Sequence, residues 1–68
     1  MRANEVVRLL KQNGAVFVRQ SGSHARYRSA CGKCATTVPM HPGDIKTGTL
    51  RAIEAQMEAC LGKGWLTS

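Results

Sequence analysis

A histidine and three arginines stand close together before the middle of the chain, and their spacing suits chemistry on an anion. His24, Arg26 and Arg28 occupy every second position, and Arg19 precedes them. Because residues two apart in a β-strand point to the same face, an extended segment here places an imidazole beside guanidinium groups. Imidazole, with an ordinary pKa of about 6.5, acts as acid or base near neutral pH, and guanidinium binds phosphate oxygens. Taken alone, the same residues are more often ordinary exposed, solvated side chains.

The positive charge of the chain is concentrated in its first part. Residues 1–43 carry seven basic residues and one acid, whereas residues 44–68 balance to zero. The length predicts one domain with a small core, because a chain of this size buries only about 60% of the surface that its unfolded form exposes. Positive charge confined to one part of a small domain favours a polyanion or an acidic protein as partner over a neutral metabolite.

A pair of cysteines at metal-ligand spacing is the second candidate for chemistry. Cys31 and Cys34 could supply half of a zinc site, since two thiolates at this spacing occur in many such sites. The other half is missing, because only Cys60, His24 and His41 remain as nitrogen or sulfur ligands, and we assign Cys60 to a helical core stripe. We therefore expect no metal and an incidental hairpin turn, with a metal site or a disulfide across the turn as alternatives. An odd number of cysteines also argues against a disulfide framework.

Apolar spacing and turn residues predict five elements in the order α-β-β-β-α. In chain order they are a helix that Asn4 caps and Gly14 ends, strands over residues 15–20, 24–30 and 35–40, and a helix that Thr47 or Thr49 caps and Gly62 ends. Pro39 argues that the third strand lies at a sheet edge, because proline cannot donate to a neighbouring strand.

This order predicts an α+β fold, a three-stranded antiparallel sheet with two helices on one face and the other face open. If two-residue turns at Ser21-Gly22 and Gly32-Lys33 close the hairpins, alternation gives each face its residues. The core face then holds Val16, Val18, Ala25, Tyr27, Val38 and Met40. The open face holds Arg19, His24, Arg26 and Arg28. The same register sets Arg19 and His41 opposite His24, Phe17 opposite Arg26, Val16 and Val38 opposite Tyr27, and Thr37 opposite Arg28.

We expect a cytoplasmic protein with no membrane segment. The longest unbroken apolar run, residues 15–18, is far shorter than the roughly 20 residues that a membrane span requires. Charged residues also stand at the N-terminus, where a secretory signal needs an apolar stretch. The domain is expected over residues 1–61, followed by a short, loosely attached tail over residues 62–68. Trp65 in this tail either packs back on the core or anchors in a partner protein or a second copy.

Several blocks of sequence, taken together, carry a family resemblance. They are Glu5 to Gly14, Val16 to Gln20, Gly22-Ser23-His24 followed by Tyr27, Val38 to Gly43, and Gly48 to Ile53. In their order and spacing these blocks resemble the HicA family, and they cover nearly the whole chain up to residue 60. No single block is specific, but several aligned blocks are hard to obtain by chance. The resemblance implies a fold like that of double-stranded-RNA-binding domains.

The resemblance also implies a function: a toxin of a toxin-antitoxin system that cleaves mRNA without a metal or other cofactor and is neutralised by a HicB-type antitoxin. It assigns catalysis to His24, the histidine after the Gly-Ser turn. Metal-free scission needs a base for the ribose 2′-hydroxyl and an acid for the leaving 5′-oxygen, and it yields a 2′,3′-cyclic phosphate. His41 is a candidate second acid or base, although it is more often a loop residue. The residues expected to bind RNA are Arg19, Gly22, Ser23, Arg26 and Arg28.

Two other functions stay open. A non-catalytic RNA-binding module of the double-stranded-RNA-binding fold would use a basic face to bind duplex RNA by its shape and phosphates. Such modules use lysines at the start of the second helix, where this chain offers only Lys46 and Arg51. A pure interaction protein would dock an acidic partner on the same face. The segment Glu54-Ala55-Gln56, where relatives often carry a lysine, makes the second helix less cationic.

Overall fold

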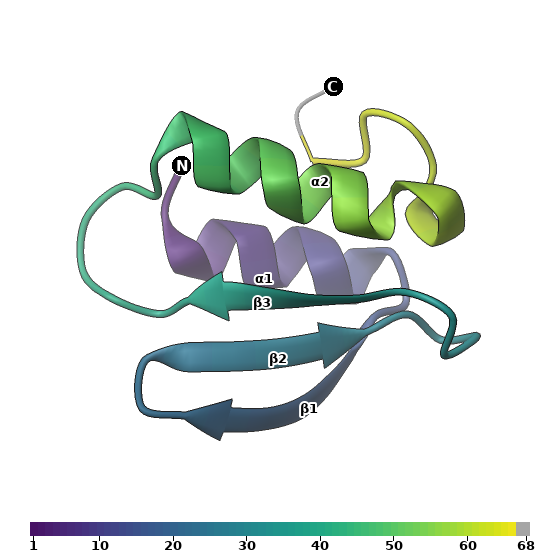
Figure 1. The fold of residues 1–68 in the computed structure, drawn as a ribbon, viewed down its shortest axis with the longest axis horizontal. Coiled ribbons are helices and arrows are strands. Elements are labelled where there is room, and N and C mark those ends of the chain that lie inside the picture. Colours follow the sequence, from purple (N-terminus) through teal and green to yellow (C-terminus); the bar gives the residue numbers. More distant parts are fainter. Residues whose placement is uncertain (67–68) are drawn as a thin grey trace.

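Two helices and a three-stranded antiparallel sheet make up the computed structural model, which describes residues 1–66 (Figure 1). In chain order the elements are α1 (Ala3–Gln12), β1 (Val16–Ser21), β2 (His24–Arg28), β3 (Ala35–Pro39) and α2 (Thr47–Leu61). The strands lie in the order β1-β2-β3. Figure 1 shows α2 alongside β3, with β1 at the far edge of the sheet. The predicted α-β-β-β-α order and α+β class are confirmed.

The core lies on the helix side of the sheet and is small. One cluster of buried side chains contains Val6 and Leu10 from α1, Tyr27 and Val38 from the sheet, and Met57 from α2. Because both helices and the sheet contribute to one cluster, both helices cover the same face of the sheet. Neither helix in residues 1–66 has both the length and the apolar character needed to cross a bilayer.

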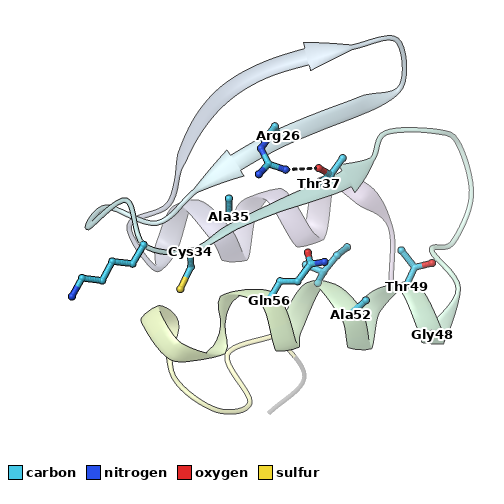
Figure 2. A pocket seen from close by; sticks show the side chains of 10 residues that line it. Arg26, Cys34, Ala35, Thr37, Gly48, Thr49, Ala52 and Gln56 are labelled. Carbon is cyan, nitrogen blue, oxygen red and sulfur yellow. Dashed lines mark hydrogen bonds between the residues drawn. The ribbon is translucent and has the colours of Figure 1, made fainter.

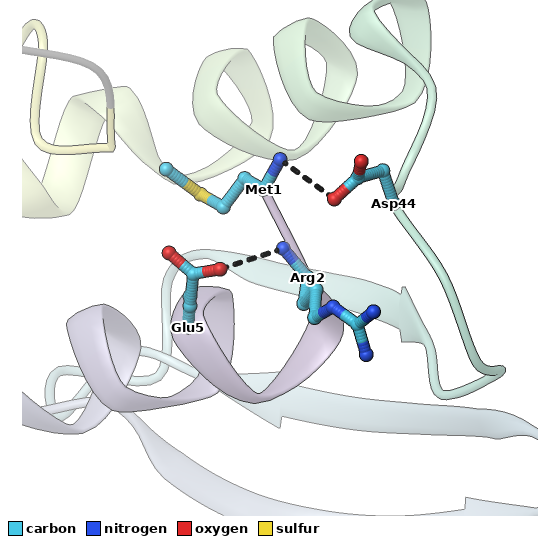
Figure 3. Close-up of polar contacts among 4 residues, drawn as sticks. All are labelled: Met1, Arg2, Glu5 and Asp44. Atoms are coloured by element: carbon cyan, nitrogen blue, oxygen red, sulfur yellow. Dashed lines mark hydrogen bonds and ion pairs between the residues drawn. The ribbon is translucent and has the colours of Figure 1, made fainter.

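Both helices begin without the side-chain caps that the sequence predicted. Helix α1 begins after Arg2 rather than Asn4, and the Arg2 amide donates to Glu5 Oε1 at 3.1 Å (Figure 3). Helix α2 begins after Lys46, whose backbone is extended and whose side chain makes no cap. The reason is backbone pairing between the two starts: Arg2 pairs with Asp44, and the Ile45 amide donates to the Met1 carbonyl at 2.9 Å. This pairing holds both segments extended up to the first helical residue.

The register of the β1–β2 hairpin differs from the predicted one. The turn is Gly22-Ser23, so Ser21 faces His24 and Arg19 faces Arg26. A β-bulge between Phe17 and Arg19 then shifts the pairing by one residue, which reverses the faces of the residues before it. Phe17 therefore lies opposite Tyr27, and Val16 opposite Arg28.

The bulge explains why the prediction of Val16 and Val18 as core residues was wrong. Both valines are more than 40% exposed, and Phe17 is 53% exposed although its ring makes an edge contact with Tyr27 at 5.6 Å between centroids. Strand β1 is the edge strand furthest from α2, so no helix residue buries these side chains. Alternation in a strand predicts burial only where an opposing layer exists.

The β2–β3 pairing is displaced by two residues from the predicted register. The connection runs from Ser29 to Cys34, whose carbonyl accepts a hydrogen bond from the Ser29 amide at 2.8 Å, and is longer than the predicted two-residue turn. Arg26 therefore faces Thr37, and His24 faces Pro39 rather than His41. Because a shift of two residues preserves the alternation, the predicted faces of β2 and β3 are retained.

A disulfide joins β3 to α2, which the sequence interpretation missed. Cys34, directly before β3, is bonded to Cys60 in the last turn of α2, with their Cα atoms 6.3 Å apart. The predicted alternatives for Cys34 were an incidental turn, a metal site or a bond to Cys31. Cys60 does lie on the core side of α2, as its stripe position indicated, and this is the side that faces β3.

Residues 62–66 fold back onto the core, so this part of the predicted tail is not loosely attached. Trp65 and Leu66 are at most 9% exposed, and Trp65 Nε1 donates to the Glu54 carbonyl at 3.0 Å. The Leu66 amide donates to Glu54 Oε2 at 3.2 Å. Of the alternatives for Trp65, the structure shows packing on the core. Residues 67 and 68 of the predicted tail lie outside the described residues.

We expect Trp65→Ala to lower the free energy of unfolding by about 3 kcal/mol, because it removes a buried indole and its hydrogen bond. Urea unfolding followed by circular dichroism measures the change. Val18→Ala, at an exposed position, is the control and should cost well under 1 kcal/mol. Equal stability of the Trp65 variant and the unmodified chain would contradict the packing of the tail.

Candidate functional site

The open face of the sheet carries a row of basic side chains. His24, Arg26 and Arg28 alternate along β2 with the buried Ala25 and Tyr27, so all three face away from the helices. Arg19 joins them from β1, because directly opposed residues share a face and Arg19 pairs with Arg26. The four residues predicted for the open face are therefore on one side of the sheet.

No carboxylate neutralises this face in residues 1–66. An ion pair joins the Met1 amino group to Asp44 Oδ1 at 3.4 Å (Figure 3), and neither partner belongs to the open face of the sheet. The guanidinium of Arg26 instead donates from Nη1 to Thr37 Oγ1 at 3.2 Å. Uncompensated charge on one face makes a positive potential that attracts anions.

His24 stands at the rim of a pocket of about 460 Å³ at one end of the sheet. The lining comes from four segments: the start of β2, strand β3, the loop that follows β3, and the start of α2. The lining residues are His24, Thr37, Pro39, His41, Asp44, Lys46 and Thr49. The structure thus brings both histidines to one pocket, although they do not pair across the strands.

Backbone contacts on both sides fix the position of His24. On one side the Gly22-Ser23 turn precedes it, and Gly22 has a φ of +59°, a left-handed value at the first turn position that glycine adopts without strain. On the other side the Met40 amide donates to the Ser23 carbonyl, which extends the β2–β3 pairing past Pro39. His24, the first residue of β2, is therefore positioned by the turn that precedes it and by the backbone pairing with β3.

The ring of His41 is oriented by one hydrogen bond. Its Nδ1 lies 3.2 Å from the carbonyl oxygen of Pro42. Because a carbonyl only accepts, Nδ1 carries the proton, and the neutral ring has its lone pair on Nε2. Nε2 is then the nitrogen that can take up a proton as a base or return it as an acid.

A second pocket of about 760 Å³ continues the first one between β3 and α2. The two pockets share Thr37 and Thr49 in their linings, so they adjoin, and we call them together the α2–β3 groove. Figure 2 shows Arg26 and Thr37 on the strands on one side and Thr49, Ala52 and Gln56 on α2 on the other. Gln56 is fixed there, because its Oε1 accepts a hydrogen bond from Thr36 Oγ1 at 2.7 Å.

The start of α2 adds positive character to the groove. Lys46 lines it directly, and the first turn of α2 has no acidic residue and no side-chain cap. Free amide groups and the positive end of a helix dipole favour an anion at such a position. Asp44 lies near, but its carboxylate is paired with the amino group of Met1.

The predicted site residues divide into three groups. His24, Arg26 and His41 line the groove, whereas Arg19 and Arg28 share the open face outside the two pockets. Gly22 and Ser23 form the turn before His24. The sequence interpretation did not single out Thr37 and Thr49 as site residues, since a lone threonine has no distinctive spacing. Lys46 was noted only as a weak match to the lysines that double-stranded-RNA-binding modules carry at the start of their second helix. A lysine directly before a helix is also a signal for an anion site.

In residues 1–66 no group of three or more His, Cys, Asp or Glu side chains is placed to hold a metal ion.

Comparison with protein families gives one finding: the family model described as the HicA toxin of bacterial toxin-antitoxin matches residues 3–59. Comparisons with curated proteins and with solved structures gave no match.

We expect Gly22→Ala to lower the free energy of unfolding by about 1–2 kcal/mol, because an L-residue is strained at the positive φ of this turn. A Cβ at Gly22 would meet no atom within 4 Å, so the cost comes from the backbone alone. Gly48→Ala in α2 is the matched control, since its Cβ also meets nothing and alanine favours a helix. Urea unfolding should therefore give changes of opposite sign, and no loss for Gly22→Ala would contradict the turn geometry.

Proposed function

This chain belongs to the HicA toxin family of bacterial toxin-antitoxin systems, and we propose that it is an endoribonuclease that cleaves mRNA with His24 as its catalytic residue. The observation that supports this most strongly is the groove itself. It brings an acid-base side chain, His24, to the same pocket as His41 and Lys46, next to the uncompensated guanidinium of Arg26.

The two imidazoles match the two proton transfers of RNA scission. One base must remove the proton of a ribose 2′-hydroxyl so that its oxygen attacks the adjacent phosphorus, and one acid must protonate the leaving 5′-oxygen. In the proposed reaction His24 performs one of these transfers and His41 Nε2 is the candidate for the other. The products are a 2′,3′-cyclic phosphate and a 5′-hydroxyl end, and this route requires no metal.

The positive groups of the site match the other requirement, the stabilisation of charge on the phosphate. Arg26 lines the pocket between β3 and α2, Lys46 lines the pocket that holds both histidines, and the amide groups of the first turn of α2 follow Lys46 in the chain. Donors that are fixed before the reaction stabilise the developing charge without a cost of reorganisation. In the proposal Arg19, Arg28 and the Gly22-Ser23 turn bind the flanking phosphates along the open face.

The family also implies an antitoxin partner. We propose that the partner is a HicB-type antitoxin and that toxin and antitoxin act in the cytoplasm, where mRNA is found. A basic, uncompensated face is suited to an acidic surface on such a partner, because complementary charge accelerates association.

A non-catalytic RNA-binding module is the alternative, and the fold and the arginines of the open face fit it equally well. The two functions differ in what they require of His24. A binding module needs only positive charge along the face, whereas a nuclease needs an imidazole at this position.

We expect His24→Ala to abolish RNA cleavage and growth arrest while leaving the fold and RNA binding intact, since the side chain is exposed and belongs to no core contact. Growth after induced expression, cleavage of an mRNA in vitro and thermal unfolding measure these properties. Lys11→Ala, on the exposed side of α1, is the control and should retain full toxicity. Cleavage by a folded His24 variant would refute the catalytic assignment, and absence of cleavage by the unmodified chain would favour the binding module.

We expect His41→Gln to slow cleavage by on the order of a hundredfold, as is typical when a general acid or base is removed. The unmodified enzyme should show a bell-shaped dependence of rate on pH, and the variant should lose one limb. The rate is measured under single turnover over a range of pH. Near-normal turnover with both limbs present would leave His24 as the sole catalytic histidine.

A further inference from the structure

The three cysteines gather at the end of the molecule opposite the histidines. Cys34 and Cys60 are bonded, and the free thiol of Cys31 lies with its Sγ 3.5 Å from Cys60 Sγ. Because Cys60 is already in a disulfide, only Cys31 has a proton to donate in this contact. A separation of this size is close to that of a reacting pair before a bond forms.

Ser29 holds the loop that carries Cys31. The serine is buried, its amide donates to the Cys34 carbonyl at 2.8 Å, and its carbonyl accepts from the Gly32 amide at 2.9 Å. Its Oγ accepts a hydrogen bond from the Cys34 amide at 3.1 Å. The hydroxyl proton is therefore free to point to Cys31 Sγ, which lies 3.3 Å away.

These contacts favour the thiolate form of Cys31. The hydrogen bond from the Ser29 hydroxyl lowers the pKa of the exposed Cys31 thiol most, and a hydrogen bond from the backbone of Lys33 lowers it further. The thiolate is the nucleophile in cysteine chemistry, so a lowered pKa increases the reactive fraction near neutral pH. Exposure also gives the sulfur access to solvent and to small reagents.

We propose that Cys31 is the nucleophile of a thiol–disulfide exchange site formed by the three cysteines. The Cys31 thiolate attacks Cys60 Sγ, a Cys31–Cys60 bond forms, and the Cys34–Cys60 bond breaks with its electron pair on Cys34 Sγ. The Cys34 thiolate then takes a proton from water. The exchange conserves one disulfide and one thiol, so it consumes no oxidant or reductant.

The exchange would change what holds the α2–β3 groove together. In the starting form the bond ties the end of α2 to the first residue before β3, and Cys34 lines the groove. In the exchanged form α2 is tied to the loop over residues 29–33 instead, and a free thiol stands in the groove wall. The inference is independent of the proposed RNA cleavage.

The test follows which cysteine is free. Oxidised protein is incubated at pH 8, quenched with acid, alkylated with a maleimide and digested with trypsin, which cuts after Lys33 and separates Cys31 from Cys34. Mass spectrometry should find label on Cys31 and on Cys34, together with peptides linked by Cys34–Cys60 and by Cys31–Cys60. The exchanged form should appear at a rate independent of protein concentration. Cys31→Ser is the control and should leave Cys34 unlabelled.

Two further variants keep the test decisive. Cys34→Ser should form a Cys31–Cys60 disulfide on mild oxidation, and it reports on the exchanged form even if that form is a minor one. Ser29→Ala should slow alkylation of Cys31 about tenfold near neutral pH and move its pH profile to higher pH. Label on Cys31 alone in the unmodified chain, together with no Cys31–Cys60 bond in Cys34→Ser, would overturn the proposal.

Discussion

The alternation of strand β2 is the constraint on which the rest of the molecule depends. It is the one strand of the described sheet with a neighbour on both sides, and its five residues alternate strictly between open face and core. Ala25 and Tyr27 point to the helices and anchor the core, so His24, Arg26 and Arg28 must point to the solvent. A strand paired on both edges cannot slip by one residue without exposing Tyr27 and burying an arginine, and both changes are costly.

The second helix is tied down at several points because the core is too small to fix it alone. Backbone pairing of Met1 with Ile45 holds its start, the Cys34–Cys60 bond holds its last turn, and Trp65 packs back beside it. Since α2 forms one wall of the groove, these ties also set the width of the groove. Chains of this length commonly supplement a small core with such covalent or terminal contacts.

The order of the elements and the open face could be predicted from the sequence because both depend on local periodicity. Alternating residues in β2 suffice to place His24 and Arg26 on the same side. The pairing could not be predicted, since the bulge at Val18 depends on the balance of the whole hairpin and no residue marks it. The groove also escaped prediction, because it requires Thr37 and Thr49, which are distant in sequence, to meet across β3 and α2. The disulfide could not be predicted for the same reason, because spacing along the chain does not show which turn of α2 lies beside the residue before β3.

The bulge in β1 has a second consequence, for the behaviour of this protein at high concentration. Within residues 1–66 no strand pairs with the outer edge of β1, and the residues from Val16 to Val18 are 42% to 53% exposed. This combination favours pairing with the edge of another molecule. The extra residue bends the strand and breaks the regular row of free amide and carbonyl groups that such pairing needs. A net charge of +6 adds long-range repulsion between copies. The irregularity that shifts the pairing of Val16 and Phe17 thereby also makes this apolar edge less suited to start aggregation.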